Sequence, residues 1–220
     1  MRTVPPTTFA FRLPAWLRLE MAQRADTCHR TDEARMRLAV RLADLNVRHG
    51  TGGPFGAAVF ERRTGRLAAA GVNLVVAGRC ACLHAEIVAL SLAQRRLRTH
   101  DLSAAGEYEL HASAEPCTMC LGAVSWSGIR RLACGARGAD VEAAGFDEGP
   151  KPAGWAAALR TRGIAVRRDL LRGESAAVLR AYAAAGGPVY NPARRSLTYP
   201  DMCDCRNRRR RSDSGRRSIA

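Results

Sequence analysis

The 220-residue sequence lacks any long hydrophobic run. No apolar stretch approaches the ~18–20 residues that a helix needs to span a bilayer. Residues 1–30 also lack the pattern of a signal peptide, because prolines and arginines interrupt every apolar stretch there. These absences argue against a membrane protein, and we predict a cytoplasmic one.

Lysine is almost absent: Lys151 is the only one, while arginine is frequent and the formal net charge is +15. The positive charge is densest in residues 203–220, which hold seven arginines against two aspartates. A strongly basic balance is one mark of proteins that bind nucleic acids. The scarcity of lysine and the abundance of alanine are also typical of the codon bias of a GC-rich genome. We favour that second interpretation and do not expect nucleic acid as a partner.

The chain also lacks internal repeats, and its length suits one globular domain. The apolar fraction of 47% is ample for a buried core. We predict a loosely structured leader over 1–30 and a folded domain over 31–187. Glycine, proline, asparagine and arginine then dominate, which predicts a C-terminal segment over 188–202 and a disordered Arg-rich tail over 203–220. The tail has too few apolar residues to offset its ordering entropy.

The hydrophobic pattern within the domain predicts alternating helices and strands. Thr31, followed by acidic residues and by apolar residues at helical spacing as far as Gly50, predicts the first helix. Two strands, 55–61 and 67–76, flank a predicted hairpin turn. Further strands are predicted over 107–113, 129–135 and 164–168, and further helices over 83–95, 117–126, 139–145, 152–161 and 174–184. This alternation is typical of a layered α/β/α domain around one sheet.

Eight cysteines occur without a secretion pattern, so metal ligands or buried thiols are expected rather than disulfides. Cys117 and Cys120 form a CxxC at the start of a predicted helix, where the helix dipole and the free backbone N–H groups favour thiolates. His84, at the start of another predicted helix, supplies a third ligand. Three protein ligands leave one tetrahedral position for water, as a catalytic zinc site requires, whereas a structural zinc site uses four.

Glu86 lies two residues after the predicted histidine ligand. Zinc lowers the pKa of its water towards about 7, and a nearby carboxylate can take that proton and pass it to a substrate. The arrangement H-x-E…P-C-x-x-C is the signature of zinc deaminases. We therefore predict a Zn²⁺-dependent hydrolytic deaminase. Two alternatives are a buried core histidine with a structural CxxC, and a non-catalytic zinc module that binds a partner. A structural zinc site has no use for Glu86.

The other cysteines are not predicted to bind this metal. Cys80 and Cys82 precede His84, but they fall in the loop before the helix. Cys134 lies in a predicted strand and is expected to be a buried thiol. Three further cysteines belong to no organised pattern: Cys28, Cys203 and Cys205.

Four motifs invite comparison with a known family. They are GGPF at 52–55, HAE at 84–86, EPCTMCLGA at 115–123 and VEAAGFDE at 141–148. With them, the sequence resembles the cytidine and deoxycytidylate deaminase superfamily over about 31–192. Within it, the chain most resembles bacterial guanine deaminases of the cytidine-deaminase fold, some of which also act on ammeline. The two metal motifs are common to the superfamily, whereas the last motif is characteristic of the guanine-type branch and differs in tRNA adenosine deaminases.

This resemblance implies a three-layer α/β/α cytidine deaminase-like fold with a central five-stranded mixed sheet. It also implies roles for matched positions. Asn73 would hydrogen-bond the purine, and the backbone N–H of Ala85 would contact a ring carbonyl. Phe146 would form a wall of the pocket. From the residues alone, Asn73 is equally a turn residue and Phe146 equally a core residue.

The resemblance further implies that Glu148 is a second acid and proton shuttle near the leaving amine, although Glu142 and Asp147 compete for this role. It also implies a homodimer, in which the C-terminal segment can swap to close the partner's pocket. Tyr190 lies where such a segment would contact the substrate, while the Arg-rich tail departs from the family pattern.

The expected reaction is hydrolysis of guanine to xanthine and ammonia. In it, Glu86 protonates the ring nitrogen and relays a proton to the amine, helped by Glu148. The alternatives are deamination of ammeline, guanosine, cytidine or cytosine, or of adenosine in tRNA.

Overall fold

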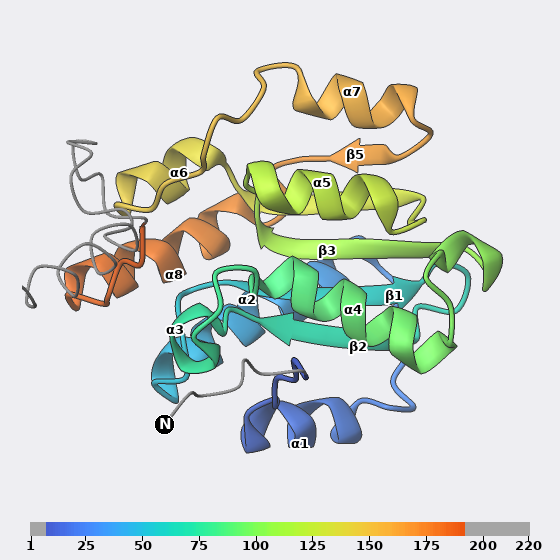
Figure 1. Cartoon of the computed structure of the whole chain (residues 1–220), viewed down its shortest axis with the longest axis horizontal. Coiled ribbons are helices and arrows are strands. Elements are labelled where there is room, and N and C mark those ends of the chain that lie inside the picture. The colour runs from blue at the N-terminus through green and yellow to red at the C-terminus, as the bar shows by residue number, and fades with distance from the viewer. Residues whose placement is uncertain (1–7, 192–220) are drawn as a thin grey trace, which may run out of the picture. The chain divides into compact units, whose positions relative to one another are not determined.

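A computed structural model describes residues 8–191 of the chain (Figure 1). The predicted tail over 203–220, with Cys203 and Cys205, and most of the segment 188–202 lie outside the described residues. The fold belongs to one compact unit that ends at Tyr190. Among the described residues, no helix combines the length and the apolar character that a membrane span demands.

A five-stranded mixed sheet forms the centre of the fold, as predicted (Figure 1). Its strands are β1 (Gly56–Glu61), β2 (Leu67–Val72), β3 (Tyr108–Ala114), β4 (Arg131–Ala136) and β5 (Ala165–Arg167), in the spatial order β2-β1-β3-β4-β5. β1 pairs antiparallel with β2 and β3, whereas β3, β4 and β5 run parallel. The parallel pairs need crossover connections, and a helix lies in each of them.

Helices cover both faces of the sheet, which confirms the predicted α/β/α layers (Figure 1). Successive residues of β1 point to opposite faces: Ala57 and Val59 pack in the cluster that contains the buried residues of α4, whereas Ala58 and Phe60 pack with Leu42 of α2. The helices are α1 (Ala15–Gln23), α2 (Asp32–Arg48), α3 (Val75–Gly78), α4 (Ala85–Leu97), η1 (Leu102–Ala104), α5 (Thr118–Trp126), α6 (Gly138–Ala143), α7 (Trp155–Thr161) and α8 (Arg172–Ala184).

The second strand of the hairpin is shorter than predicted. It ends at Val72, and residues 75–78 form α3 instead of continuing the strand. The side chain of Asn73 explains the end of the strand, because its Oδ1 accepts a hydrogen bond from the backbone N–H of Val75 at 3.3 Å. Such local side-chain bonds compete with strand pairing.

The leader was predicted to be loosely structured, and this prediction is wrong for residues 15–23, which form α1. Leu17 is fully buried, and Trp16 stacks on His49 with 5.1 Å between the ring centroids. The indole Nε1 of Trp16 also donates to the hydroxyl of Thr51 at 3.1 Å. Tertiary packing rather than a strong local pattern therefore stabilises this short helix.

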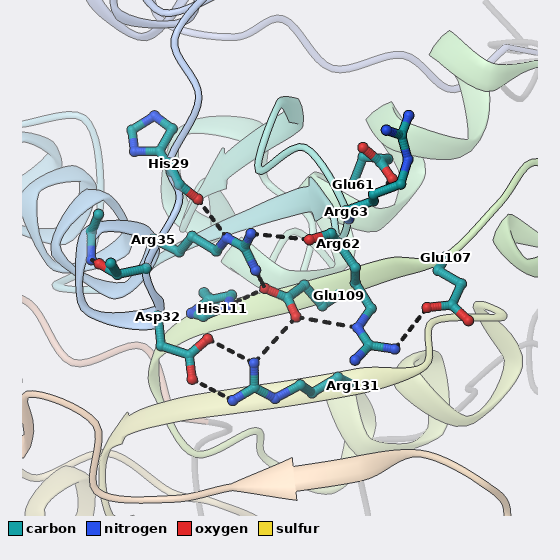
Figure 2. A network of polar contacts seen from close by, with 12 residues as sticks. His29, Asp32, Arg35, Glu61, Arg62, Arg63, Glu107, Glu109, His111 and Arg131 are labelled. Atoms are coloured by element: carbon teal, nitrogen blue, oxygen red, sulfur yellow. Dashed lines mark hydrogen bonds and ion pairs between the residues drawn. The ribbon is translucent and has the colours of Figure 1, made fainter.

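A buried polar network joins α2 to the sheet (Figure 2). Glu109 of β3, 1% exposed, accepts hydrogen bonds from Arg35 and from Arg131, and lies 2.8 Å from His111 Nε2. Arg131 also forms a bidentate ion pair with Asp32, at 2.7 and 2.5 Å. The arginines already compensate both carboxylates, so we assign no metal to Asp32, Glu109 and His111 although their polar atoms lie within 4.8 Å of one another.

Candidate metal centre

Both metal motifs lie at the first turns of helices. His84 is the N-cap residue of α4, and Cys117 is the N-cap residue of α5, three residues after β3 ends. The first backbone N–H groups of a helix have no acceptor within the helix and favour negative charge nearby. The two helix starts therefore form a common electropositive setting for thiolates and carboxylates.

The three predicted ligands come together. The Sγ atoms of Cys117 and Cys120 lie 3.5 and 3.6 Å from Nδ1 of His84. Zinc bonds of about 2.3 Å to sulfur and about 2.0–2.1 Å to nitrogen, at a tetrahedral angle, place the two ligand atoms about 3.6 Å apart. The geometry therefore fits a zinc ion. Within residues 8–191 no fourth ligand, whether histidine, cysteine or acidic side chain, joins the group, and Cys80 and Cys82 lie outside it, as predicted.

The thiols of Cys117 and Cys120 differ in their pKa values. The hydrogen bond from Cys120 lowers the pKa of Cys117 to about 4, whereas the same contact and burial raise the pKa of Cys120 well above its usual range. Burial disfavours a charged His84, but contacts with Cys117 and Glu86 outweigh it and raise the pKa of this imidazole. The contact between the two cysteines therefore makes Cys117 the more acidic of the two thiols, and a bound cation would favour the thiolate form of both.

Glu86 lies in the first turn of α4 and is 8% exposed. Burial, followed by the charge of Cys117, raises the pKa of Glu86 to about 7, and a bound dication would counteract this shift. A carboxyl group that titrates near neutral pH can both accept and deliver a proton. Ala85, 1% exposed, is the first residue of α4, so its backbone N–H has no acceptor within the helix.

Of the three acidic residues between 141 and 148, only Glu148 is buried, whereas Glu142 and Asp147 are exposed. The backbone carbonyl of Glu148 accepts hydrogen bonds from the N–H and the hydroxyl of Thr118, at 3.1 and 3.2 Å. Burial raises the pKa of Glu148, and the charge of Cys117 adds to this effect. The fold therefore brings Glu148, and not its two competitors, to the first turn of the metal-binding helix.

Asn73, Phe146 and Tyr190 meet beside the metal ligands. Nδ2 of Asn73 donates to the hydroxyl of Tyr190 at 2.5 Å. The Tyr190 ring lies 6.2 Å from the His84 ring and 5.4 Å from the Phe146 ring, measured between centroids. Asn73 and Phe146 are both buried, and each also has the structural contacts that the sequence left open, a turn contact for Asn73 and core packing for Phe146.

The turn at Gly52 and Gly53 packs tightly against this group. A Cβ atom at Gly52 would lie 1.9 Å from the carbonyl oxygen of Asn73, and one at Gly53 would lie 3.1 Å from the Tyr190 ring. Asn46 of α2, fully buried, donates from Nδ2 to the carbonyls of Gly53 and Asn73, each at 2.9 Å. Asn46 was not predicted from the sequence; a polar residue on the buried face of an amphipathic helix is the signal that points to it.

Comparison with known proteins is consistent with this geometry. Residues 29–136 match the family described as the cytidine and deoxycytidylate deaminase zinc-binding region. A solved guanine deaminase from Nitrosomonas europaea is 50% identical, with a TM-score of 0.76 over 83% of this chain and 100% of that one. A solved protein in complex with 2,6-diaminopurine is 52% identical, with a TM-score of 0.76 over 83% of this chain and 96% of that one. Guanine deaminase from Bacillus subtilis is 36% identical over 116 residues, which are 53% of this chain and 71% of that protein.

The family match includes both metal motifs, and its zinc-binding character agrees with the positions of the three ligand atoms. The similarity to the Nitrosomonas protein extends over the whole of that chain and therefore includes the sheet as well as the metal centre. This chain belongs to the cytidine and deoxycytidylate deaminase family.

Proposed function

We propose that this protein is a zinc-dependent guanine deaminase, which hydrolyses guanine to xanthine and ammonia. The observation that carries the proposal is the buried position of Glu148, from the EAAGFDE run of the guanine-type branch, at the first turn of the metal-binding helix. The similar solved proteins, a guanine deaminase and a protein in complex with 2,6-diaminopurine, support a purine base as the substrate.

His84, Cys117 and Cys120 would hold the metal. When bound there, zinc supplies an activated water for hydrolysis. Glu86, whose pKa burial raises to about 7, takes a proton from the attacking water and delivers it to the ring nitrogen beside the amino-bearing carbon. Glu148 then helps to move a proton to the amino group, which leaves as ammonia.

The remaining predicted residues would hold the flat ring. Phe146 and Tyr190 present aromatic surfaces beside the metal ligands, and Asn73 offers an amide donor and acceptor. The N–H of Ala85, which has no acceptor within the helix, would bond a ring carbonyl. Because Nδ2 of Asn73 bonds the Tyr190 hydroxyl, a purine that accepts from this amide has to share it with Tyr190 or replace it.

Tyr190 contacts Asn73 and the ring of His84 of the same chain. A homodimer in which the C-terminal segment swaps between partners remains a prediction, as does a cytoplasmic location. Sedimentation of the zinc-loaded protein tests the dimer directly.

Ammonia release from the zinc-loaded protein tests the proposed reaction. The panel consists of guanine, guanosine, cytosine, cytidine, ammeline and an adenosine-containing tRNA. Guanine is expected to give the highest kcat/KM. Turnover of another substrate without turnover of guanine would overturn the assignment. Activity on tRNA that falls steeply with salt concentration would indicate nucleic-acid editing instead, because phosphate contacts make affinity depend on salt.

A further inference from the structure

The only lysine of the chain lies half-buried beside the predicted proton shuttle. Nζ of Lys151, whose side chain is 12% exposed, lies 2.9 Å from Oε2 of Glu148 and 3.4 Å from Oε2 of Glu115. It also lies 5.5 Å from the centroid of the Trp155 ring. An ammonium group is more compact than a guanidinium group and can direct its three donors separately. In a chain that otherwise uses arginine, this position suits the smaller cation.

Glu115 has other partners than Lys151. Its Oε1 accepts from Nε of Arg168 at 2.6 Å, and its Oε2 accepts from the backbone N–H of Gly138 at 3.0 Å. The contact from Lys151 to Glu115 is the longest of the three. Buried carboxylates need compensation, and Arg168 provides it for Glu115. The ammonium of Lys151 is therefore chiefly the partner of Glu148, at 2.9 Å, and its contact with Glu115, at 3.4 Å, is weaker.

The backbone leaves room for this contact at Gly138. A Cβ atom there would lie 3.1 Å from Nζ of Lys151 and 3.7 Å from Oε2 of Glu148. The main chain of Glu148 is tied to Thr118 through its carbonyl oxygen. Glu148 is thus held at two points, its carbonyl by α5 and one carboxylate oxygen by Lys151.

We propose that Lys151 is a positioning residue for the deamination: it holds Oε2 of Glu148, so that the carboxylate keeps a fixed place beside the metal centre and the other oxygen stays available to the substrate. This inference rests on the proposed function, in which Glu148 moves a proton to the leaving amine. A flexible carboxylate would reach the amine in only a fraction of encounters, and misplacement of a catalytic group lowers the rate of the chemical step rather than substrate binding.

Kinetics of Lys151→Met and Lys151→Arg test the positioning role. The methionine keeps the length of the side chain and removes the ammonium, whereas the arginine keeps the charge. With zinc content and thermal unfolding matched to the wild type, K151M is expected to lower kcat by up to about 100-fold, the cost of a misplacement of about 1 Å in an active site. Its KM stays within about twofold. K151R is expected to recover part of kcat. A K151M enzyme with wild-type kcat overturns the proposal.

The same substitution in a Glu148→Gln background separates positioning from general structure. If Lys151 acts through Glu148, the single variant E148Q and the double variant E148Q/K151M are expected to have equal kcat, because effects of residues that act as a unit are not additive. An equal loss in both backgrounds contradicts the proposal. Arg168→Met is the matched control, since it removes a cation from the same cluster but no partner of Glu148. Its effect on kcat is expected to be much smaller than that of K151M.

The failure of this inference can be told apart from failure of the proposed function. Turnover of guanine by the wild type tests the function, whereas the ratios between variants, measured on whichever base is turned over, test Lys151. Crystal structures of the zinc-loaded wild type and K151M supply a readout that needs no activity. The carboxylate of Glu148 is expected to move or become disordered in K151M, and an unchanged, ordered carboxylate there overturns the proposal.

Discussion

Glu86 and Glu148 are both buried carboxylates near the metal ligands, but different contacts hold them. Glu86 lies in the first turn of α4, where the helix dipole favours its charge, yet burial raises its pKa to about 7. Burial also raises the pKa of Glu148, but there Lys151 opposes the shift as a direct counter-charge. Lys151 thus stabilises the charged form of Glu148, whereas burial raises the proton affinity of Glu86, which suits the group that takes a proton from the attacking water.

Replacing Glu86 with glutamine tests this role. Glutamine keeps the shape of the side chain but cannot accept a proton, so kcat is expected to fall by about 10²–10⁴-fold, the usual contribution of general acid–base catalysis. Zinc content is expected to stay at the wild-type level, because Glu86 is not among the three ligands. Metal analysis and ammonia release measure the two quantities. Normal turnover in this variant would refute the catalytic role of Glu86.

Gly52 is a second residue whose identity the site requires. In Gly52→Ala the new Cβ would lie 1.9 Å from the carbonyl oxygen of Asn73, a backbone atom that cannot shift without moving the main chain. Overpacking of this kind costs about 1–3 kcal/mol, and the displaced turn is expected to raise KM. Gly154→Ala is the control, because no atom lies within 4 Å of a Cβ there. Chemical denaturation and steady-state kinetics of both variants check the prediction. Equal stabilities of Gly52→Ala and Gly154→Ala would contradict it.

α2 connects the site to the rest of the fold from both of its ends. Near its C-terminus, Asn46 bonds the carbonyls of Gly53 and Asn73. Near its N-terminus, Arg35 bonds Glu109, and its guanidinium also reaches the backbone carbonyl of His29 at 2.8 Å (Figure 2). The helix thus fixes the glycine turn at one end and the leader at the other, so its register on the sheet decides where Asn73 lies.

Arg35→Met is therefore expected to destabilise the whole fold. The variant removes the shortest ion pair of the buried Glu109 and leaves Arg131, at 3.3 Å, as a more distant cation. The loss is expected to approach about 3–5 kcal/mol, the cost of breaking a buried ion pair. Arg41→Met, on the same helix, breaks only an ion pair to Glu20 in which the arginine side chain is 52% exposed, and exposed pairs contribute about 0–1 kcal/mol. Urea unfolding of the two variants gives the comparison. Equal losses of stability would show that the network does not hold α2.

Elements with a strong local pattern could be predicted from the sequence. Thr31 caps α2 as expected, by accepting from the N–H of Ala34, and the CxxC and HAE motifs lie at helix starts. α1 could not be predicted, because the packing of Leu17 and Trp16 stabilises it. β3 shows a further limit. Its alternation of apolar and acidic residues suggests a half-buried strand, whereas both of its faces are buried.

The site shows the same division. Cys117, Cys120 and His84 are recognisable because metal ligands have fixed spacing, and Cys134 is the buried thiol that was predicted. Lys151 and Asn46 have no such spacing. The role of Asn46 depends on a contact with Asn73, 27 positions further along the chain. The contact of Lys151 with Glu148, only three positions away, depends on the conformation of the loop that holds them. Only the three-dimensional fold could show these contacts.

Across the whole molecule, the two faces of the sheet have separate tasks. α4 and α5, whose first turns carry the metal ligands, pack on one face of the sheet. α2 packs on the other face, where the buried ion-pair network lies. β3 joins the two: Glu109 and His111 face α2, while Leu110 and Ala112 lie in the cluster with α4. Substitutions in the network are therefore expected to change stability before they change the chemistry.

The network should also make stability depend on pH. Burial lowers the pKa of His111 below its usual 6.5, although Glu109 opposes the shift. Burial alone would raise the pKa of Glu109, but its contacts with His111 and Arg35 lower it overall. In both cases the folded state binds the proton more weakly than the unfolded chain, so stability is lost as the pH falls. Glu86 and Glu148, whose pKa values are raised, act in the opposite sense.

A comparison with His111→Gln tests this coupled pair, because the variant removes the titrating ring together with a contact that lowers the pKa of Glu109. The variant lacks the titrating ring and keeps every other acid and base. The stability of the wild type relative to H111Q is expected to be constant above about pH 7 and to fall below 6.5, the usual pKa of histidine. The slope approaches about 1.4 kcal/mol per pH unit, the limit for one proton. Urea unfolding of both zinc-loaded proteins at pH values from about 8 to about 5 measures this slope. Both proteins keep the metal ligands, so any loss of zinc in acid cancels in the difference between their stabilities. Parallel curves of stability against pH would mean that burial does not hold His111 neutral.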